Sequence, residues 1–145
     1  MKKDLVKAWM TRDVVSVSSD TILPKAHRLM TEKRIRRLPV VDNDRLVGII
    51  TLGDVREAQP SDATSLSIWE TNYLLTELEV GSIMTQNPIT ISPYATIREA
   101  AWSMLEYKLS GLPVVDNDGK VVGILTESDI FRLVVQEWGD LKLAA

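Results

Sequence analysis

The chain has 145 residues, of which 45% are hydrophobic and 26% are charged, a balance typical of a globular protein with a buried core. It contains no cysteine, which excludes a disulfide scaffold, a thiol nucleophile and a metal site with cysteine ligands. The net charge of −3 argues against general binding to nucleic acid or to an anionic membrane surface.

The hydropathy of the sequence bears on the cellular location of the protein. The residues after Met1 lack the apolar run of a signal peptide, and no stretch approaches the roughly 18 apolar residues of a membrane span. We therefore expect a cytoplasmic protein.

The first half of the chain predicts the order β-α-β-β-α. The helix is indicated by apolar residues at helical spacing from Leu23 to Met30, with Pro24 tolerated in its first turn. The run Asp-Asn-Asp between the second and third strands is good turn chemistry. The expected elements are a strand at 14–18, a helix from Leu23, strands at 38–41 and 46–50, and a second helix opening at Thr51.

The second half repeats the first. Met10-Thr11 matches Met84-Thr85, and residues 38–44 match residues 112–118 without a change. One extra residue then enters the turn, after which Gly48-Ile49 matches Gly123-Ile124. A one-residue shift at a turn is what duplication followed by loop drift would leave.

The duplication predicts the domain organisation and an α/β (α+β) fold. Each half is small for independent stability, so we expect the two β-α-β-β-α repeats to pack through their sheets with pseudo-two-fold symmetry. In the connector, residues 59–62 should break helix, and an amphipathic segment follows with Ile68, Trp69, Tyr73, Leu74 and Leu75. The expected parts are repeat 1 at 1–58, the connector at 59–79, repeat 2 at 80–139 and a C-terminal tail at 140–145.

The repeated pattern resembles a known family. Met-Thr, a strand, a helix, Leu-Pro-Val-Val-Asp and then Gly-Ile-x-Thr-x-x-Asp resembles a CBS domain, and two in tandem resemble a CBS pair, or Bateman module. The resemblance covers nearly the whole chain. The connector is similar to that of the CBS pair of acetoin-utilisation-type proteins, which usually continue into an ACT domain, whereas this chain stops at Ala145.

The resemblance implies a regulatory role. CBS pairs bind AMP, ADP, ATP or other adenosyl compounds in clefts between the repeats, and commonly form a disc-shaped homodimer that signals to an effector protein. The alternative is a structural dimerisation module without a physiological nucleotide. We expect no enzyme activity, catalytic residue, cofactor, metal, nucleic acid or membrane partner, because no catalytic motif occurs and the lone His27 has no partner nearby in sequence.

Two stretches, GIITLGD and GILTESD, lead from a strand into a helix. The N–H groups of a helix's first turn lack internal partners and lie at the positive end of the dipole, which makes an anion site. The resemblance implies three pairs of contacts: Asp54 and Asp129 to ribose hydroxyls, Thr51 and Thr126 to ribose or phosphate, and Ile49 and Ile124 to the adenine. Thr-x-x-Asp is equally close to a capping box that needs no ligand, and both interpretations stay open.

Residues before the helices complete the implied site. The resemblance implies backbone contacts to a purine from Ser16-Val17 and Thr90-Ile91, although the sequence alone shows only short strands there.

Before the strand Leu-Pro-Val-Val the two copies differ, because Arg36 and Arg37 in the first correspond to Ser110 and Gly111 in the second. Arg suits bidentate contact with phosphate. The resemblance implies that these positions face the ribose-binding Asp of the other repeat. We therefore expect Arg36 or Arg37 to meet the phosphates of a nucleotide held by Thr126 and Asp129, and the cleft of Thr51 and Asp54 to bind more weakly. The alternative is a solvated, basic helix end.

Overall fold

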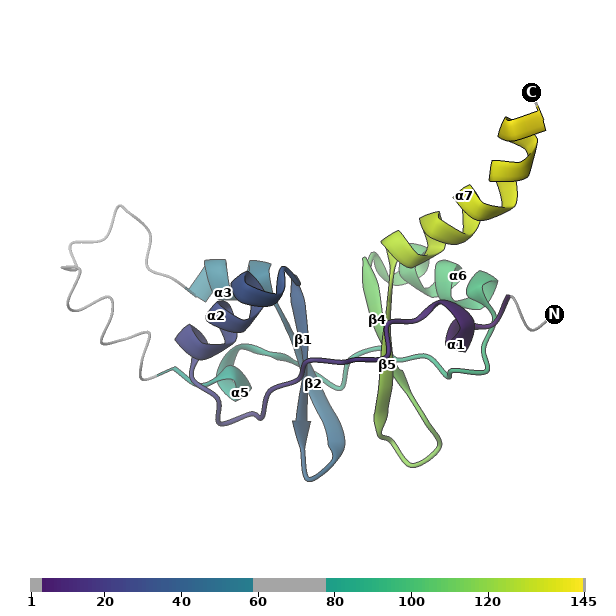
Figure 1. The fold of residues 1–145 in the computed structure, drawn as a ribbon. Coiled ribbons are helices and arrows are strands. Elements are labelled where there is room, and N and C mark those ends of the chain that lie inside the picture. Colours follow the sequence, from purple (N-terminus) through teal and green to yellow (C-terminus); the bar gives the residue numbers. More distant parts are fainter. Residues whose placement is uncertain (1–3, 59–77, 145) are drawn as a thin grey trace. The chain divides into compact units, whose positions relative to one another are not determined.

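The computed structural model describes residues 4–58 and 78–144, and the side chains within 4–58 and 78–137. The chain forms two compact units, which we call unit 1 (residues 1–14 and 89–145) and unit 2 (residues 15–88). Figure 1 shows the helices and strands of each unit. The amphipathic connector segment expected around Ile68 to Leu75 lies outside the described residues.

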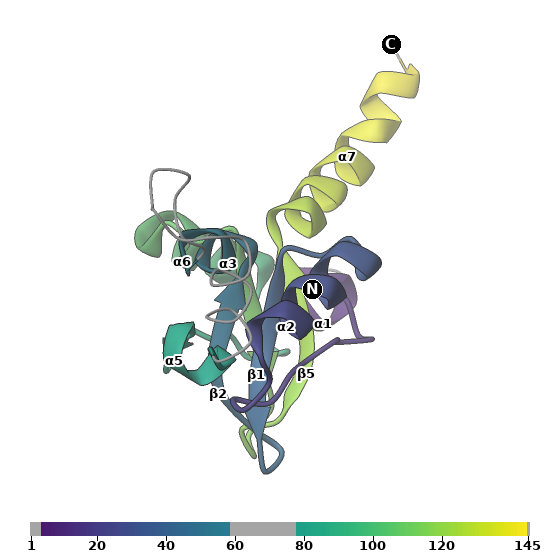
Figure 2. The ribbon, with the colours of Figure 1, turned by 90° about the vertical axis from the view of Figure 1, so that its left-hand side faces the viewer.

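Unit 2 is a three-stranded antiparallel sheet with helices on one face. Helices α2 and α3 lie on the same side of the β1–β2 hairpin (Figures 1 and 2). The strand order is β1-β2-β3. Its elements are α2 (Leu23–Lys33), β1 (Arg37–Asp42), β2 (Arg45–Thr51), α3 (Leu52–Ala58), α5 (Val80–Ile83) and β3 (Thr85–Gln86).

Unit 1 repeats this plan. The β4–β5 hairpin is antiparallel, α6 packs against β4 and α7, and α1 packs against β5 and α7. Its elements are α1 (Val6–Trp9), α6 (Ile97–Tyr107), β4 (Gly111–Val115), β5 (Val121–Thr126) and α7 (Glu127–Ala144). The expected helices and hairpins are therefore confirmed in both units, while the expected packing of the repeats through their sheets stays a prediction.

The strands expected at 14–18 and 88–92 are shorter than the alternating pattern suggested. Each forms a single parallel bridge, Val17 with Val40 and Ile91 with Val114. Sequence on either side limits the pairing, because the turn closed by Thr21 begins at Ser18 and Pro88 has no N–H to donate.

Equivalent apolar residues build the two cores. In α2, Leu23, Ala26 and Met30 are buried on one face, as the helical spacing predicts. The matched pairs are Val6 and Val80, Val17 and Ile91, Leu23 and Ile97, Ala26 and Ala100, Met30 and Met104, Leu38 and Leu112, Val40 and Val114, and Ile50 and Leu125. Every member of these pairs is buried, so the duplication is preserved where packing is tightest.

The extra residue of the second repeat changes the hairpin turn. In unit 2, Asn43 and Asp44 both have positive φ, 51° and 63°, which matches a two-residue type I′ turn. In unit 1 the loop has three residues and ends on Gly119 at φ 80°. The insertion is thus absorbed in the loop, and the strands keep the same register on both sides of it.

A Met-Thr segment completes each sheet. Thr11 forms two backbone hydrogen bonds with Ile124 in unit 1, of 2.9 and 3.0 Å. In unit 2, β3 pairs Thr85 with Ile49 of β2. The Met-Thr segment at the start of repeat 1 therefore joins the strands of repeat 2, and the Met-Thr segment at the start of repeat 2 joins the strands of repeat 1. The sequence pattern did not predict this exchange.

Glycine permits the close approach of each Met-Thr segment. A Cβ at Gly48 would lie 2.9 Å from the carbonyl oxygen of Thr85, and a Cβ at Gly123 would lie 3.0 Å from that of Thr11. Both approaches are tighter than nearly all Cβ contacts in proteins, and the side chains of Met84 and Met10 would lie closer still, so a larger residue must push the segment away.

Within the described ranges, no helix combines the length and apolarity that a bilayer crossing requires. The cytoplasmic location stays a prediction.

We expect Gly48→Ala and Gly123→Ala each to destabilise the protein by about 1–3 kcal/mol, because overpacking forces the backbone to shift. Urea unfolding measures the change. Gly53→Ala is the matched control, since its Cβ would meet only the Thr51 hydroxyl at 3.6 Å, and alanine is favoured in helix α3. A Gly123→Ala variant as stable as Gly53→Ala would contradict the role of close approach.

The carboxylate of Asp42 ties the end of β1 to the chain before α2. It accepts hydrogen bonds from the Ser19 hydroxyl at 2.6 Å and the Ser19 backbone N–H at 3.0 Å. These two bonds, the hydroxyl bond foremost, lower the pKa of Asp42 from its ordinary value.

We expect Ser19→Ala to raise the pKa of Asp42 toward that of an unfolded aspartate, about 3.9. Because the folded pKa is the lower one, the bond stabilises the protein above about pH 3.9, and this stabilisation is lost as the pH falls through the folded pKa. Carboxyl NMR titration of both proteins, with urea unfolding between pH 3 and 7, checks this. A stability difference between the variants that stays constant over that range would contradict it.

Candidate functional site

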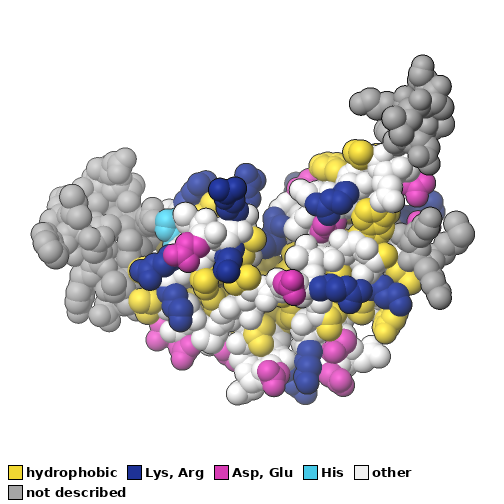
Figure 3. All heavy atoms as spheres, in the orientation of Figure 1, with side chains coloured by type: hydrophobic (Ala, Val, Ile, Leu, Met, Phe, Trp, Pro, Cys, Tyr) yellow, Lys and Arg dark blue, Asp and Glu magenta, His cyan; other side chains and the backbone are white. Residues whose placement is uncertain are grey.

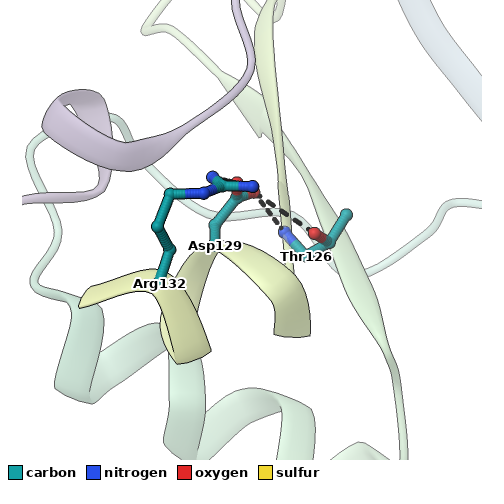
Figure 4. Close-up of polar contacts among 3 residues, drawn as sticks. All are labelled: Thr126, Asp129 and Arg132. Atoms are coloured by element: carbon teal, nitrogen blue, oxygen red, sulfur yellow. Dashed lines mark hydrogen bonds and ion pairs between the residues drawn. The ribbon is translucent and has the colours of Figure 1, made fainter. Parts of the chain in front are cut away.

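The Thr-x-x-Asp stretch of unit 1 lies where β5 passes into α7. Asp129 Oδ2 accepts hydrogen bonds from the Thr126 backbone N–H at 2.9 Å and the Thr126 hydroxyl at 3.3 Å (Figure 4). Asp129 Oδ1 pairs with Arg132, whose guanidinium nitrogen lies 2.8 Å away. Thr126 ends the strand, and the other two residues come from the first turns of the helix, so the sequence itself holds the group together.

The burial of this group is uneven. Asp129 is only 3% exposed, and among the described side chains no other charged one is buried. The side chain of Arg132, in contrast, is 63% exposed. A buried carboxylate needs a cation or several donors, and Arg132 and Thr126 supply both. Sequence reasoning missed Arg132, although its position three residues after Asp129 on one helix was the available signal.

The equivalent stretch of unit 2 forms a closed capping box. The Thr51 backbone N–H donates to Asp54 Oδ2 at 2.9 Å, and the Asp54 backbone N–H donates to the Thr51 hydroxyl at 3.1 Å. Asp54 is half-buried, and the residue corresponding to Arg132 is Glu57, which is exposed. The two junctions therefore share their backbone geometry and differ in charge.

These bonds bear on the two interpretations left open by the sequence. The capping contacts exist in both units without a ligand, complete in unit 2 and partial in unit 1, where the Thr126 hydroxyl donates to Asp129. A carboxylate has about four acceptor positions, so capping leaves room for a sugar hydroxyl. The ribose contacts implied for Asp54, Asp129, Thr51 and Thr126 stay predictions.

The residues before β1 and β4 lie beside the Thr of their own unit. Arg37 pairs with Thr51 across the β1–β2 ladder, and the Arg36 carbonyl accepts a hydrogen bond from the N–H of Leu52 at 2.8 Å. The Arg36 side chain is exposed. The contact of Arg36 or Arg37 with a nucleotide held by Thr126 and Asp129 concerns the other unit and stays a prediction.

Unit 1 has the same arrangement with small residues. Gly111 pairs with Thr126, and the Ser110 carbonyl accepts a hydrogen bond from the N–H of Glu127 at 3.0 Å. Ser110 and Gly111 thus stand where unit 2 has Arg36 and Arg37. The cation at the junction of unit 1 is Arg132, which comes from α7.

The four residues implied to contact a purine differ in exposure. Val17 and Ile91 are 8% exposed and use both backbone groups to pair with β1 and β4. Their neighbours Ser16 and Thr90 are exposed. Because successive residues of an extended segment face opposite ways, the backbone of Ser16 and Thr90 is the part still accessible to a purine edge.

Ile49 and Ile124 stand two residues before the two Thr residues. Each is half-buried and pairs with the Met-Thr segment of its unit, Ile49 with Thr85 and Ile124 with Thr11. Ile49 with Thr51, and Ile124 with Thr126, therefore lie at the end of β2 and of β5 next to the exchanged segment, whereas Val17 and Ile91 lie on the far side of β1 and β4 from it.

Comparison with known proteins agrees with this plan. The model of the CBS domain family matches residues 3–61 and 80–136. A CBS domain-containing protein from Dictyostelium discoideum is 38% identical over 135 residues, which cover 92% of this chain and 93% of that protein.

Two solved structures cover 92% of this chain and 97% of their own, each with a TM-score of 0.76. One is CBSX2 of Arabidopsis thaliana in complex with AMP, 32% identical. The other is the CBS domain pair of protein MJ0100 in complex with 5′-methylthioadenosine and S-adenosyl-L-methionine, 31% identical. The resemblance to acetoin-utilisation-type proteins is also confirmed, since a putative protein of this type from Vibrio cholerae is 29% identical with a TM-score of 0.76 over 97% of this chain.

Some relatives are enzymes, and in these the match is confined to a part. An inosine-5′-monophosphate dehydrogenase from Korarchaeum cryptofilum is 37% identical over 125 residues, which are 86% of this chain and 23% of that enzyme. The match therefore concerns the CBS portion common to many proteins, and the chain belongs to the CBS domain family as a tandem CBS pair.

Proposed function

We propose that this chain is a regulatory module, and not an enzyme, that binds AMP, ADP, ATP or a related adenosyl compound. The observation that carries the proposal is the pair of similar structures in complex with AMP or with methylthioadenosine and S-adenosylmethionine, each matched over 92% of this chain. The cytosolic domain of the Mg²⁺ channel MgtE in complex with ATP is a further match, at 26% identity and a TM-score of 0.72.

The strand-to-helix junctions support this proposal. Each offers an acidic side chain for sugar hydroxyls, a Thr hydroxyl, and exposed backbone beside the sheet at Ser16 or Thr90. These groups suit the ribose and the purine edge, and α7 adds the positive end of an 18-residue helix for phosphate. Binding then acts on an effector protein by favouring one conformation of the chain.

We expect a saturating adenosyl ligand to raise the melting temperature by about 5–10 °C. A ligand at one hundred times its Kd stabilises the folded state by about 2.7 kcal/mol, which is a shift of this size for a chain of about 150 residues. A thermal-shift panel of AMP, ADP, ATP, methylthioadenosine and S-adenosylmethionine measures it, with inorganic phosphate and GTP at equal ionic strength as references.

The same panel run on Asp129→Asn should show a smaller shift, because an amide accepts weaker hydrogen bonds from sugar hydroxyls than a carboxylate does. Asp118→Asn is the matched control, an exposed acid in the β4–β5 loop of the same unit. No shift with any adenosyl compound would favour the alternative of a purely structural module.

We also propose that the chain forms a homodimer through α6 and α7. Large exposed hydrophobic side chains on these two helices are Trp102, Leu105, Tyr107, Phe131 and Val135. Leu105 and Phe131 line a groove of about 560 Å³ between the helices, and the rings of Trp102 and Tyr107 stack edge to face at 6.4 Å. Apolar patches of this kind mark interaction surfaces.

A comparison with unit 2 indicates that the partner surface is α6 and α7 of a second copy of the chain. At the positions of Trp102, Leu105, Tyr107 and Phe131, unit 2 has Arg28, Thr31, Lys33 and Arg56. Basic side chains gather over α2 and α3, whereas hydrophobic ones lie along the described part of α7 (Figure 3). Pairing α6 and α7 with α2 and α3 would set these cations against the exposed hydrophobic side chains, so we infer that like faces meet across a two-fold axis.

We expect Leu105→Glu to convert the dimer into a monomer without unfolding it, since Leu105 is 81% exposed. Light scattering after size-exclusion chromatography gives the mass, and circular dichroism checks the fold. Thr31→Glu, at the equivalent exposed position of α2, should leave the dimer intact. Loss of the dimer in both variants would indicate unlike faces in contact, and loss in neither would reject this interface.

A further inference from the structure

Both oxygens of Asp129 already have partners in the chain itself. Oδ2 takes the two donors of Thr126, and Oδ1 takes the guanidinium of Arg132 at 2.8 Å. Asp129 is 3% exposed, and Arg132 projects from the next helical turn with most of its side chain in solvent (Figure 4). Arg132 therefore occupies the one carboxylate oxygen that Thr126 leaves open.

Oδ2 already accepts two hydrogen bonds and the carboxylate is almost fully buried, so a sugar hydroxyl that reaches Oδ1 competes with this guanidinium for it. Removing the cation from a buried carboxylate is strongly unfavourable unless the cation finds another anion. Adenosine and methylthioadenosine offer none. A phosphorylated one offers phosphate oxygens, which match the guanidinium fork in a bidentate contact.

We propose that Arg132 is a specificity-determining residue of unit 1, which selects phosphorylated adenosyl compounds over adenosyl compounds that carry no anionic group. When the ribose bonds to Asp129, the guanidinium leaves Oδ1 and pairs with the phosphate of the same ligand. This inference rests on the proposed function, because it names which adenosyl compounds the site accepts.

The comparison within the chain supports the assignment. The Asp54 carboxylate of unit 2 is bonded to the Thr51 backbone, and no described residue of α3 pairs with it as a cation. Glu57 occupies the place of Arg132 and is exposed. The selection is therefore a property of α7 and not of the duplicated motif.

Titration calorimetry with AMP and with adenosine tests the proposal. The proteins are the wild type, Arg132→Gln, Arg132→Lys and the matched control Arg98→Gln, which removes an exposed cation from α6 of the same unit. Each is also made with Asp54→Asn, so that binding at the junction of unit 2 is weakened and the titration reports unit 1.

We expect the wild type to bind AMP more tightly than adenosine, and Arg132→Gln to lower the affinity for AMP by about tenfold or more, as for a lost charge-assisted contact. Adenosine affinity should stay within about twofold or improve, because Oδ1 becomes free. Arg132→Lys should lie between the two, since lysine keeps the charge and lacks the fork. Arg98→Gln should behave as the wild type.

An equal loss of AMP and adenosine binding in Arg132→Gln would show a structural role and overturn the proposal, as would an unchanged ratio of the two affinities. If Arg132→Gln fails to fold, the ratio in Arg132→Lys and the salt dependence of wild-type AMP binding decide, because a guanidinium–phosphate contact weakens with salt and adenosine binding does not. A wild type that binds neither compound would instead overturn the proposed function.

Discussion

The paired backbone hydrogen bonds between a Met-Thr segment and a Gly-Ile strand close each compact unit. They require a residue without a side chain at Gly48 and Gly123, because the incoming carbonyl oxygen would lie about 3 Å from any Cβ there. The Met-Thr segment of repeat 1 pairs with a strand of repeat 2, and that of repeat 2 pairs with a strand of repeat 1, so each unit contains sequence from both halves of the chain. Separating the repeats at the connector would leave β5 without the segment that pairs with Ile124.

This closure also constrains the candidate site. Ile124 bonds to the Met-Thr segment, and Thr126 begins the junction two residues later on the same strand. A ligand held by Thr126 and Asp129 therefore contacts the strand that the other end of the sequence completes. The junction and the segment that leads to the other unit are therefore linked by backbone hydrogen bonds between Thr11 and Ile124.

The sequence predicted the helices and hairpins well because duplication supplied each pattern twice, and it placed Thr51, Asp54, Thr126 and Asp129 correctly at strand-to-helix junctions. It did not predict the exchange, since α1 and α5 have four residues and β3 has two, too few for any periodicity. It also missed the ion pair of Arg132, because the shared motif directs attention to what the copies have in common. Contacts between repeats depend on surfaces that local pattern does not encode.

The two repeats differ mainly at exposed positions and agree at buried ones. Buried pairs such as Leu38 and Leu112 are kept because a tightly packed core tolerates little change, whereas the exposed positions occupied by Phe131 and Arg132 in one copy hold Arg56 and Glu57 in the other. On α7, Phe131 of the proposed dimer face lies directly before Arg132 of the proposed ligand site. Neighbouring residues on a helix face different ways, and Phe131 lines the groove between α6 and α7 whereas Arg132 does not. The first turns of α7 thus serve the proposed ligand site and the proposed dimer face with different side chains, and any effect of a ligand on the dimer would be matched, by linkage, by an equal effect of the dimer on ligand affinity.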